Sequence, residues 1–119
     1  MTESILKIKS FDFALKVIQT YKEIIKTHKE YVLSKQFLRS GTSTGALVRE
    51  AEFAQSKADF ISKLSIGLKE SNETEYWILL LQKSGYLLQK NAEKLLAENK
   101  ELTSMLVASI KTAKKSLNK

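Results

Sequence analysis

The sequence contains no cysteine, no proline and only four glycines among its 119 residues. Without cysteine, the chain has neither a disulfide nor a thiolate ligand for a metal. This composition fits a reducing compartment, and we expect a cytoplasmic protein. The scarcity of turn-forming residues, together with a hydrophobic content of 43%, favours long helices over many short strands. The length suits a single domain over residues 1–119.

Long apolar runs are also missing. The longest, YWILLL at residues 76–81, is too short to cross a bilayer, so we expect no membrane partner. Residues 1–13 lack the apolar segment of a signal peptide, and none is expected.

An excess of positive charge lies toward the two ends of the sequence. Residues 1–35 carry a net charge of +3 and residues 111–119 of +4, whereas residues 36–110 are neutral. Such segments would attract an anionic polymer such as RNA or DNA. The alternative is a solvated lysine surface that aids solubility. The candidate nucleic-acid-binding residues are Lys22, Lys26, Lys29, Lys111, Lys114 and Lys115.

Apolar residues recur at helical spacing in four segments, which are 10–31, 34–55, 57–83 and 91–115. Ser10 is a candidate N-cap, and Ser56 with Asp59 resembles a capping box. Gly85 is a candidate C-terminal stop. The short connections place consecutive helices antiparallel to each other. The sequence therefore predicts an all-α fold, an antiparallel up-down-up-down four-helix bundle.

The segment RSGTSTGALVREA, residues 39–51, is rich in small residues that keep helical spacing. Gly41, Thr44 and Gly45 fall on the inward face of the second predicted helix, where they would let a neighbouring backbone approach closely. Each interior glycine costs about 1 kcal/mol relative to alanine, so close packing must compensate. A phosphate-binding loop would need a G-x-x-x-x-G-K-[ST] order after a strand, which this segment lacks.

Enzyme signals are weak. One histidine, His28, and no cysteine leave no recognisable nucleophile–base pair. The Glu-x-x-His pairs that hold metals in bundles do not occur, so we expect no catalytic residue, metal or cofactor. His28 lies in the apolar stripe of the first helix, which suggests a hydrogen-bonded core or interface residue. It is the only candidate general base for a remote alternative, an RNA-processing enzyme.

Charged and polar residues also fall on inward faces. Glu75 lies on the inward stripe of the third helix and therefore needs a partner. We expect a polar network formed by Arg39, Glu50 and Glu75. Glu70 and Glu73 are expected to pair on the surface with Lys63 or Lys69. In the fourth helix, Asn99 interrupts the apolar stripe, where a polar residue can fix the register.

A second apolar stripe marks the third helix. Ile66, Trp77 and Leu80 lie roughly opposite its core-facing residues, and Trp77 is the only tryptophan. A helix in a monomeric bundle needs one apolar face, so this stripe predicts an oligomer interface. The alternative is that these are scattered surface residues of the ordinary kind.

Residues 37–77, FLRSGTSTGALVREAEFAQSKADFISKLSIGLKESNETEYW, resemble the signature of the bacterial four-helix bundle proteins encoded within 23S ribosomal RNA intervening sequences, also labelled S23 ribosomal proteins. The matching positions are Arg39, Ser40, Ser43, Ala46, Glu50, Ser56, Asp59, Phe60, Leu64 and Glu75. Two positions depart from the family pattern, because Leu47 stands where asparagine is common and Ala51 where glycine is frequent.

The resemblance implies a four-helix bundle that assembles into a homopentamer. It also implies kinship with the accessory protein of diversity-generating retroelements, a basic pentamer that binds nucleic acid and a reverse transcriptase. From these observations we expect a non-enzymatic, oligomeric bundle that binds RNA or DNA nonspecifically through phosphates. The alternative is a protein–protein interaction scaffold without a direct nucleic-acid role.

Overall fold

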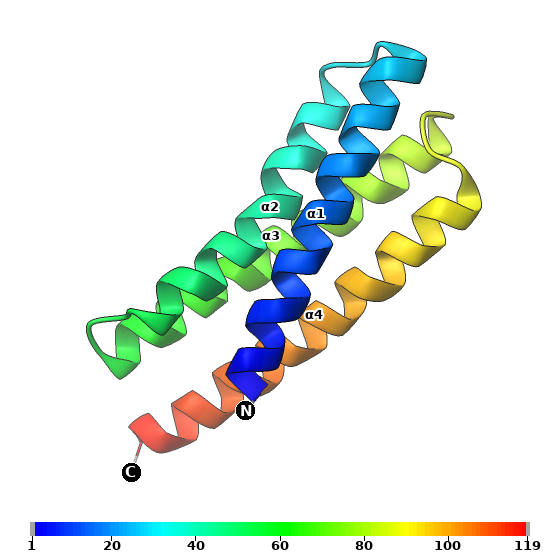
Figure 1. The fold of residues 1–119 in the computed structure, drawn as a ribbon. Helices are drawn as coiled ribbons and strands as arrows, with labels where there is room; N and C mark the ends of the chain where they lie inside the picture. The colour runs from blue at the N-terminus through cyan, green and yellow to red at the C-terminus, as the bar shows by residue number, and fades with distance from the viewer. Residues whose placement is uncertain (1, 119) are drawn as a thin grey trace.

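The computed structural model describes residues 2–118, with side chains from residue 5 onward. Its four helices are α1 (Thr2–His28), α2 (Leu33–Glu52), α3 (Lys57–Lys83) and α4 (Gln89–Leu117). Each helix packs against its two neighbours around a ring, while α1 and α3 lie on a diagonal. The rod measures 52 × 22 × 20 Å, and both termini lie at one end (Figure 1). The prediction of an all-α up-down-up-down bundle is confirmed.

The first helix begins earlier than the sequence pattern predicted. Ser10 is no N-cap: it lies in the middle of α1, is buried, and its hydroxyl donates to the backbone carbonyl of Lys7 at 3.1 Å. Leu6 and Phe13 are also buried and extend the apolar stripe toward the N-terminus. The prediction failed because a serine inside the core was interpreted as a helix boundary.

The junction between α1 and α2 is built from two backbone devices. Lys29 adopts a left-handed conformation with φ 53°, and its N–H donates to the carbonyl of Ile25 at 3.1 Å, which ends α1. The Glu30 carboxylate then accepts hydrogen bonds from the N–H groups of Val32, Leu33 and Ser34 at 2.8–2.9 Å. Glu30 thus satisfies the first free donors of α2.

The ends of α3 follow the sequence signals. Ser56 accepts a hydrogen bond from the N–H of Asp59 at 3.0 Å, which confirms the N-terminal cap. At the other end Gly85 has φ 88°, and the N–H of Tyr86 bonds to the carbonyl of Leu81 at 2.9 Å. This is the Schellman arrangement that a glycine stop favours.

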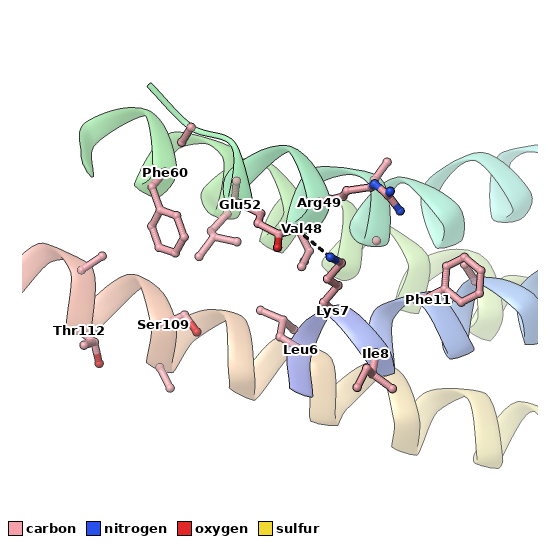
Figure 2. Close-up of a pocket in the computed structure, with 18 of the residues that line it drawn as sticks. Leu6, Lys7, Ile8, Phe11, Val48, Arg49, Glu52, Phe60, Ser109 and Thr112 are labelled. Atoms are coloured by element: carbon pink, nitrogen blue, oxygen red, sulfur yellow. Dashed lines mark ion pairs between the residues drawn. The ribbon is translucent and has the colours of Figure 1, made fainter. Parts of the chain in front are cut away.

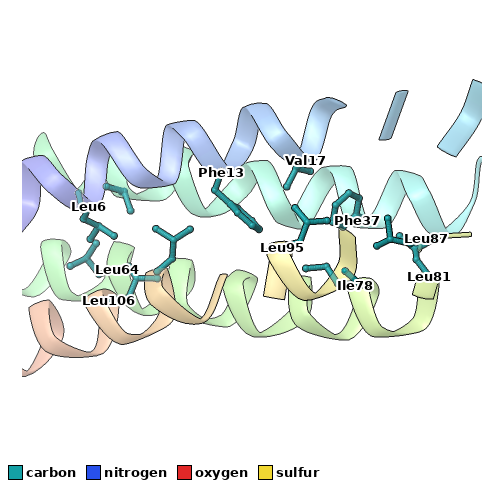
Figure 3. Packing of buried hydrophobic residues seen from close by; sticks show 14 of the residues in the cluster. Leu6, Phe13, Val17, Phe37, Leu64, Ile78, Leu81, Leu87, Leu95 and Leu106 are labelled. Carbon is teal, nitrogen blue, oxygen red and sulfur yellow. The ribbon is translucent and has the colours of Figure 1, made fainter. Parts of the chain in front are cut away.

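The core runs along the length of the rod, and all four helices contribute to it (Figure 3). A polar layer interrupts it on the α3–α4 side. The buried amide of Asn99 donates to the carbonyl of Ser71 at 2.9 Å, and the hydroxyls of Ser71 and Thr103 lie 2.7 Å apart. Asn99 therefore occupies a buried position with its amide satisfied, as expected of a residue that fixes register. No helix in the described part of the chain carries an apolar stretch long enough to cross a membrane.

Candidate nucleic-acid interface

The six lysines proposed from sequence form two separate groups. Lys22, Lys26 and Lys29 lie where α1 ends, beside the α1–α2 and α3–α4 connections; we call this the loop end. Lys111, Lys114 and Lys115 lie near the end of α4, at the opposite terminal end, which also holds the N-terminus and the α2–α3 connection (Figure 1). All six are exposed, but they do not make one continuous surface. Lys119, also part of the basic C-terminal segment, lies outside the described residues.

The fold adds three lysines to the loop end that the sequence analysis missed. Lys35 lies in the first turn of α2, Lys83 closes α3, and Lys90 is the second residue of α4. All three are exposed. Lys83 and Lys90 come from residues 36–110, whose net charge is zero, and Lys35 ends the basic segment 1–35. The loop-end lysines are therefore Lys22, Lys26, Lys29, Lys35, Lys83 and Lys90. None of these six forms an ion pair with another described residue.

Three carboxylates, those of Glu23, Glu30 and Glu93, lie among the six loop-end lysines, so this end keeps an excess of positive charge. Burial alone would raise the pKa of Glu30, but the hydrogen bonds from Leu33, Ser34 and Val32 lower it below its ordinary value overall. Glu30 therefore stays ionised, and its charge is directed at the N-terminus of α2, where an anion is favourable. Glu93 accepts a hydrogen bond from the side-chain amide of Gln89 at 3.0 Å.

Aromatic side chains lie among the loop-end lysines. Tyr31, with 56% of its surface exposed, follows directly after Lys29 and Glu30 in the α1–α2 connection. His28 contacts Tyr86 edge-on, with ring centroids 5.5 Å apart, and so joins the two connections. Of the two alternatives for His28, a core or an interface residue, the core one is wrong, because its side chain is exposed at the last position of α1.

The polar network between α2 and α3 differs from the predicted one. Arg39 pairs with Glu70 at 3.1 Å and with Glu73, while Glu75 and Glu50 are exposed. The inward interpretation of Glu75 is wrong because Thr74 takes the buried position instead. The hydroxyl of Thr74 donates to the carbonyl of Glu70 at 2.7 Å and lies 3.0 Å from the hydroxyl of Ser40, which lets a polar residue face the core.

Electrostatic contacts fix this network. The indole N–H of Trp77 and the guanidinium of Arg39 both donate to Glu73 and lower its pKa below the ordinary value. The same contact with Glu73 raises the pKa of Arg39. Lys63 pairs with Asp59 at 3.9 Å rather than with Glu70 or Glu73. These groups therefore stabilise the α2–α3 pair and leave little free charge for a ligand.

Ion pairs also engage lysines of α1 along the sides of the rod. Lys7 pairs with Glu52 of α2 at 2.9 Å, and Lys9 pairs with Glu101 of α4 at 3.0 Å. Lys16 pairs with Glu98. The lysines of α1 thus divide into paired ones on the sides and unpaired ones at the loop end. This division concentrates positive potential at the loop end.

Gly41, Thr44 and Gly45 lie inside α2, at its contact with α1 and the core. A Cβ atom at Gly41 would come within 2.7 Å of a Val17 methyl carbon, and one at Gly45 within 3.2 Å of the Ser10 carbonyl oxygen. The Thr44 hydroxyl is buried and has no hydrogen-bond partner among the described residues. These small residues set the close approach of α1 and α2, and nothing in the geometry makes them a phosphate loop.

A cleft of about 1470 Å³ opens at the terminal end, between the start of α1, the end of α2, the start of α3 and the end of α4. Figure 2 shows Phe60, Val48 and Leu6 on its walls, with the Lys7–Glu52 ion pair beside them. The cleft lining contains no histidine. The described residues also contain no cluster of three or more potential metal ligands. Apolar side chains such as Leu6, Val48 and Phe60 thus share the cleft lining with polar ones such as Ser109 and Thr112.

The predicted interface residues are only partly accessible. Ile66 is 42% exposed, whereas Trp77 and Leu80 are half-buried. The structure reveals a more exposed stripe on the diagonal helix α1, which the sequence analysis missed. It consists of Ile8, Phe11 and Leu15, which are 62%, 59% and 46% exposed. Their i, i+3, i+7 spacing places them on one face, away from the buried residues of α1.

Comparison with known proteins agrees with this architecture. Residues 3–108 match the model of the 23S rRNA-intervening sequence protein family. The chain also resembles a crystal structure of a protein of unknown function from the S23 ribosomal protein family of Bacteroides thetaiotaomicron. The two are 48% identical, with a TM-score of 0.92 over 93% of this chain and 99% of that one. None of the curated proteins matches the chain. The extent of the family match and the shared fold show that this chain belongs to the 23S rRNA-intervening sequence protein family.

Proposed function

We propose that this protein is a non-enzymatic, oligomeric bundle that binds RNA or DNA through backbone phosphates, mainly at its loop end. Membership of a family described by a ribosomal RNA intervening sequence supports an RNA-related role. The observation that carries the proposal is the group of six exposed loop-end lysines without an acidic partner among the described residues. Such lysines hold phosphates as point charges and carry no sequence information.

Self-association is the second part of the proposal. The apolar stripes of α1 and α3 lie on diagonally opposed helices of the bundle. The α1 stripe of one chain can therefore contact the α3 stripe of a neighbouring chain. Contacts between two different patches are heterologous, and they close into a ring when the rotation permits. A ring of parallel rods would bring several loop ends onto one rim, where weak phosphate contacts act together.

A salt titration tests the phosphate contacts. We expect binding of a labelled RNA to weaken steeply with salt, because each phosphate contact releases counterions. Replacing Lys26, Lys29 and Lys35 with glutamine should weaken binding and lower the log–log salt slope by about 2 for single-stranded RNA. The control replaces Lys69 and Lys100, two exposed cations on the sides of the rod without an ion pair to another described residue, and should change the slope much less for each lysine replaced.

A second triple variant measures the contribution of the terminal end. Replacing Lys111, Lys114 and Lys115 with glutamine removes the same charge from the opposite end of the rod. The loss relative to the loop-end variant gives the share of the affinity that the terminal end supplies. No binding by the wild-type protein at micromolar concentration and about 50 mM salt would contradict the proposal. The exposed α1 stripe would then favour the second candidate, a protein–protein scaffold.

A further inference from the structure

We propose that the loop end binds unpaired nucleotides in preference to duplex, with Tyr31 stacking on a base while the surrounding lysines hold the phosphates. This inference rests on the proposed function, because it names the class of nucleic acid that the same surface takes. Base stacking on an exposed aromatic ring and a positively charged track are the two parts that nonspecific single-strand binders combine. The loop end provides both.

Tyr31 is presented by a rigid segment. The N–H of Lys29 on one side is bonded to Ile25 at 3.1 Å, and the N–H groups of Val32 and Leu33 on the other are bonded to Glu30 at 2.9 Å. The backbone on both sides of the ring is therefore fixed before any ligand arrives. More than half of the side chain nevertheless remains exposed. A backbone that is already ordered limits the conformational entropy lost when a base stacks on the ring.

The surroundings of Tyr31 suit a nucleotide chain. In the sequence Lys29 lies two residues before Tyr31 and Lys35 four residues after it, and the Glu30 carboxylate between them is directed at the N-terminus of α2. The exposed ring of His28 and the half-buried Tyr86 add a second aromatic pair that joins the two connections. Val32, which is 73% exposed, extends the apolar surface next to Tyr31.

Whether the nucleic acid is single-stranded or duplex decides which groups of the loop end it can contact. A duplex exposes its phosphates to the lysines but hides the faces of its bases inside the stack, so it can use only the charges. A single strand can use both the charges and the ring. The terminal end also carries an exposed aromatic residue, Phe53, but Glu50 and Glu52 offset the charges of Arg49 and Lys57 around it in the sequence. Around Tyr31, two lysines stand against the one carboxylate of Glu30. The loop end is therefore the stronger candidate.

The experiment compares two fluorescently labelled probes by anisotropy, an oligouridine of about 12 nucleotides and an RNA duplex of the same length. We expect Tyr31→Ala to weaken oligouridine binding at least about fivefold and duplex binding less than about twofold. Tyr31→Phe keeps the ring and should bind both probes like the wild type. The matched control is Tyr76→Ala, because Tyr76 on α3 is 57% exposed, almost the same as Tyr31.

A second measurement needs no variant. An abasic strand of the same length keeps the phosphates but lacks the bases, so the wild-type protein should bind it at least about fivefold more weakly than oligouridine. Equal affinity for the abasic strand and oligouridine would overturn the inference, as would an equal loss for both probes in Tyr31→Ala. These results leave salt-dependent binding intact. Failure of the proposed function differs from them, because then no probe binds the wild-type protein and the inference falls with it.

Discussion

The indole N–H of Trp77 donates to the carboxylate of Glu73 at 2.8 Å, one turn away on α3. Arg39 of α2 donates to the same carboxylate, so Glu73 links the only tryptophan to the neighbouring helix. These two donors hold the pKa of Glu73 below its ordinary value. Because the folded-state pKa is lower than the unfolded-state pKa, this contact contributes fully to stability above the unfolded-state value. The contribution is lost as the pH falls through the folded-state pKa.

The emission of Trp77 should report that loss. We expect its fluorescence to change in acid with a midpoint below the usual range of a glutamate, before helicity measured by circular dichroism is lost. Glu73→Gln removes the titrating group but keeps an oxygen that can accept the indole hydrogen bond. Its emission should stay constant over the same pH range. An unchanged transition in Glu73→Gln would mean that another group controls the fluorescence.

Two glycines should respond in opposite ways to the same substitution. Gly41→Ala would place a Cβ atom 2.7 Å from a methyl carbon of Val17, a stiff side chain, and should lower the free energy of unfolding by about 1–3 kcal/mol. Gly67→Ala makes only ordinary contacts, the nearest being Leu47 at 3.6 Å, and should raise it by up to about 1 kcal/mol. Urea denaturation of both variants measures the difference. Equal effects would show that α1 and α2 do not pack at Gly41 as described.

The left-handed turn after α3 isolates a backbone effect. At Gly85, with φ 88°, a Cβ atom would meet nothing within 4 Å, so any cost of Gly85→Ala comes from the conformation alone. We expect a loss of about 1–2 kcal/mol in the free energy of unfolding. Gly85→Asn should lose less, because asparagine tolerates this region better. Thermal unfolding of the two variants provides the test, and an alanine variant as stable as wild type would exclude the turn.

Charge placed in an apolar stripe should dissociate the proposed ring. Phe11→Glu on α1 and Trp77→Glu on α3 each put a carboxylate where two chains would meet, and helicity should survive because neither residue is fully buried. Light scattering with circular dichroism measures both properties. Asn72→Glu, an exposed change on α3 about 80° from the nearest stripe residue on the helical wheel, is the control. A wild-type mass near 13.5 kDa at micromolar concentration would remove the oligomer from the proposal.

The sequence predicted the fold well because apolar periodicity is a local property of each helix. Predictions from the same local periodicity were wrong where small polar residues enter the core. Ser10 was read as a cap, yet it is the small residue of α1 that lies against Gly45 of α2. The sequence pattern placed Glu75 rather than Thr74 on the inward face. The Thr74 hydroxyl can be buried because it bonds to the backbone of its own helix, and periodicity does not reveal that bond.

The candidate interface was less predictable because it depends on distant segments. Lys35, Lys83 and Lys90 belong to three helices, and the neutral sum over residues 36–110 concealed two of them. Only the antiparallel arrangement places them at the same end of the rod as Lys26 and Lys29. Tyr31 gave no signal either, since its exposure follows from the Glu30 contacts at the α1–α2 junction.

The length of the rod has a consequence for how its charge is felt in solution. At physiological ionic strength the Debye length is about 8 Å, so basic groups at opposite ends of a 52 Å rod are electrically independent of each other. The net charge of +7 therefore overstates the attraction at any one point. A polyanion approaching the side of α1 meets lysines that are already paired with glutamates, whereas one approaching an end meets unpaired lysines. Attachment should consequently be end-on, with one strand held at each end rather than one strand wrapped along the length.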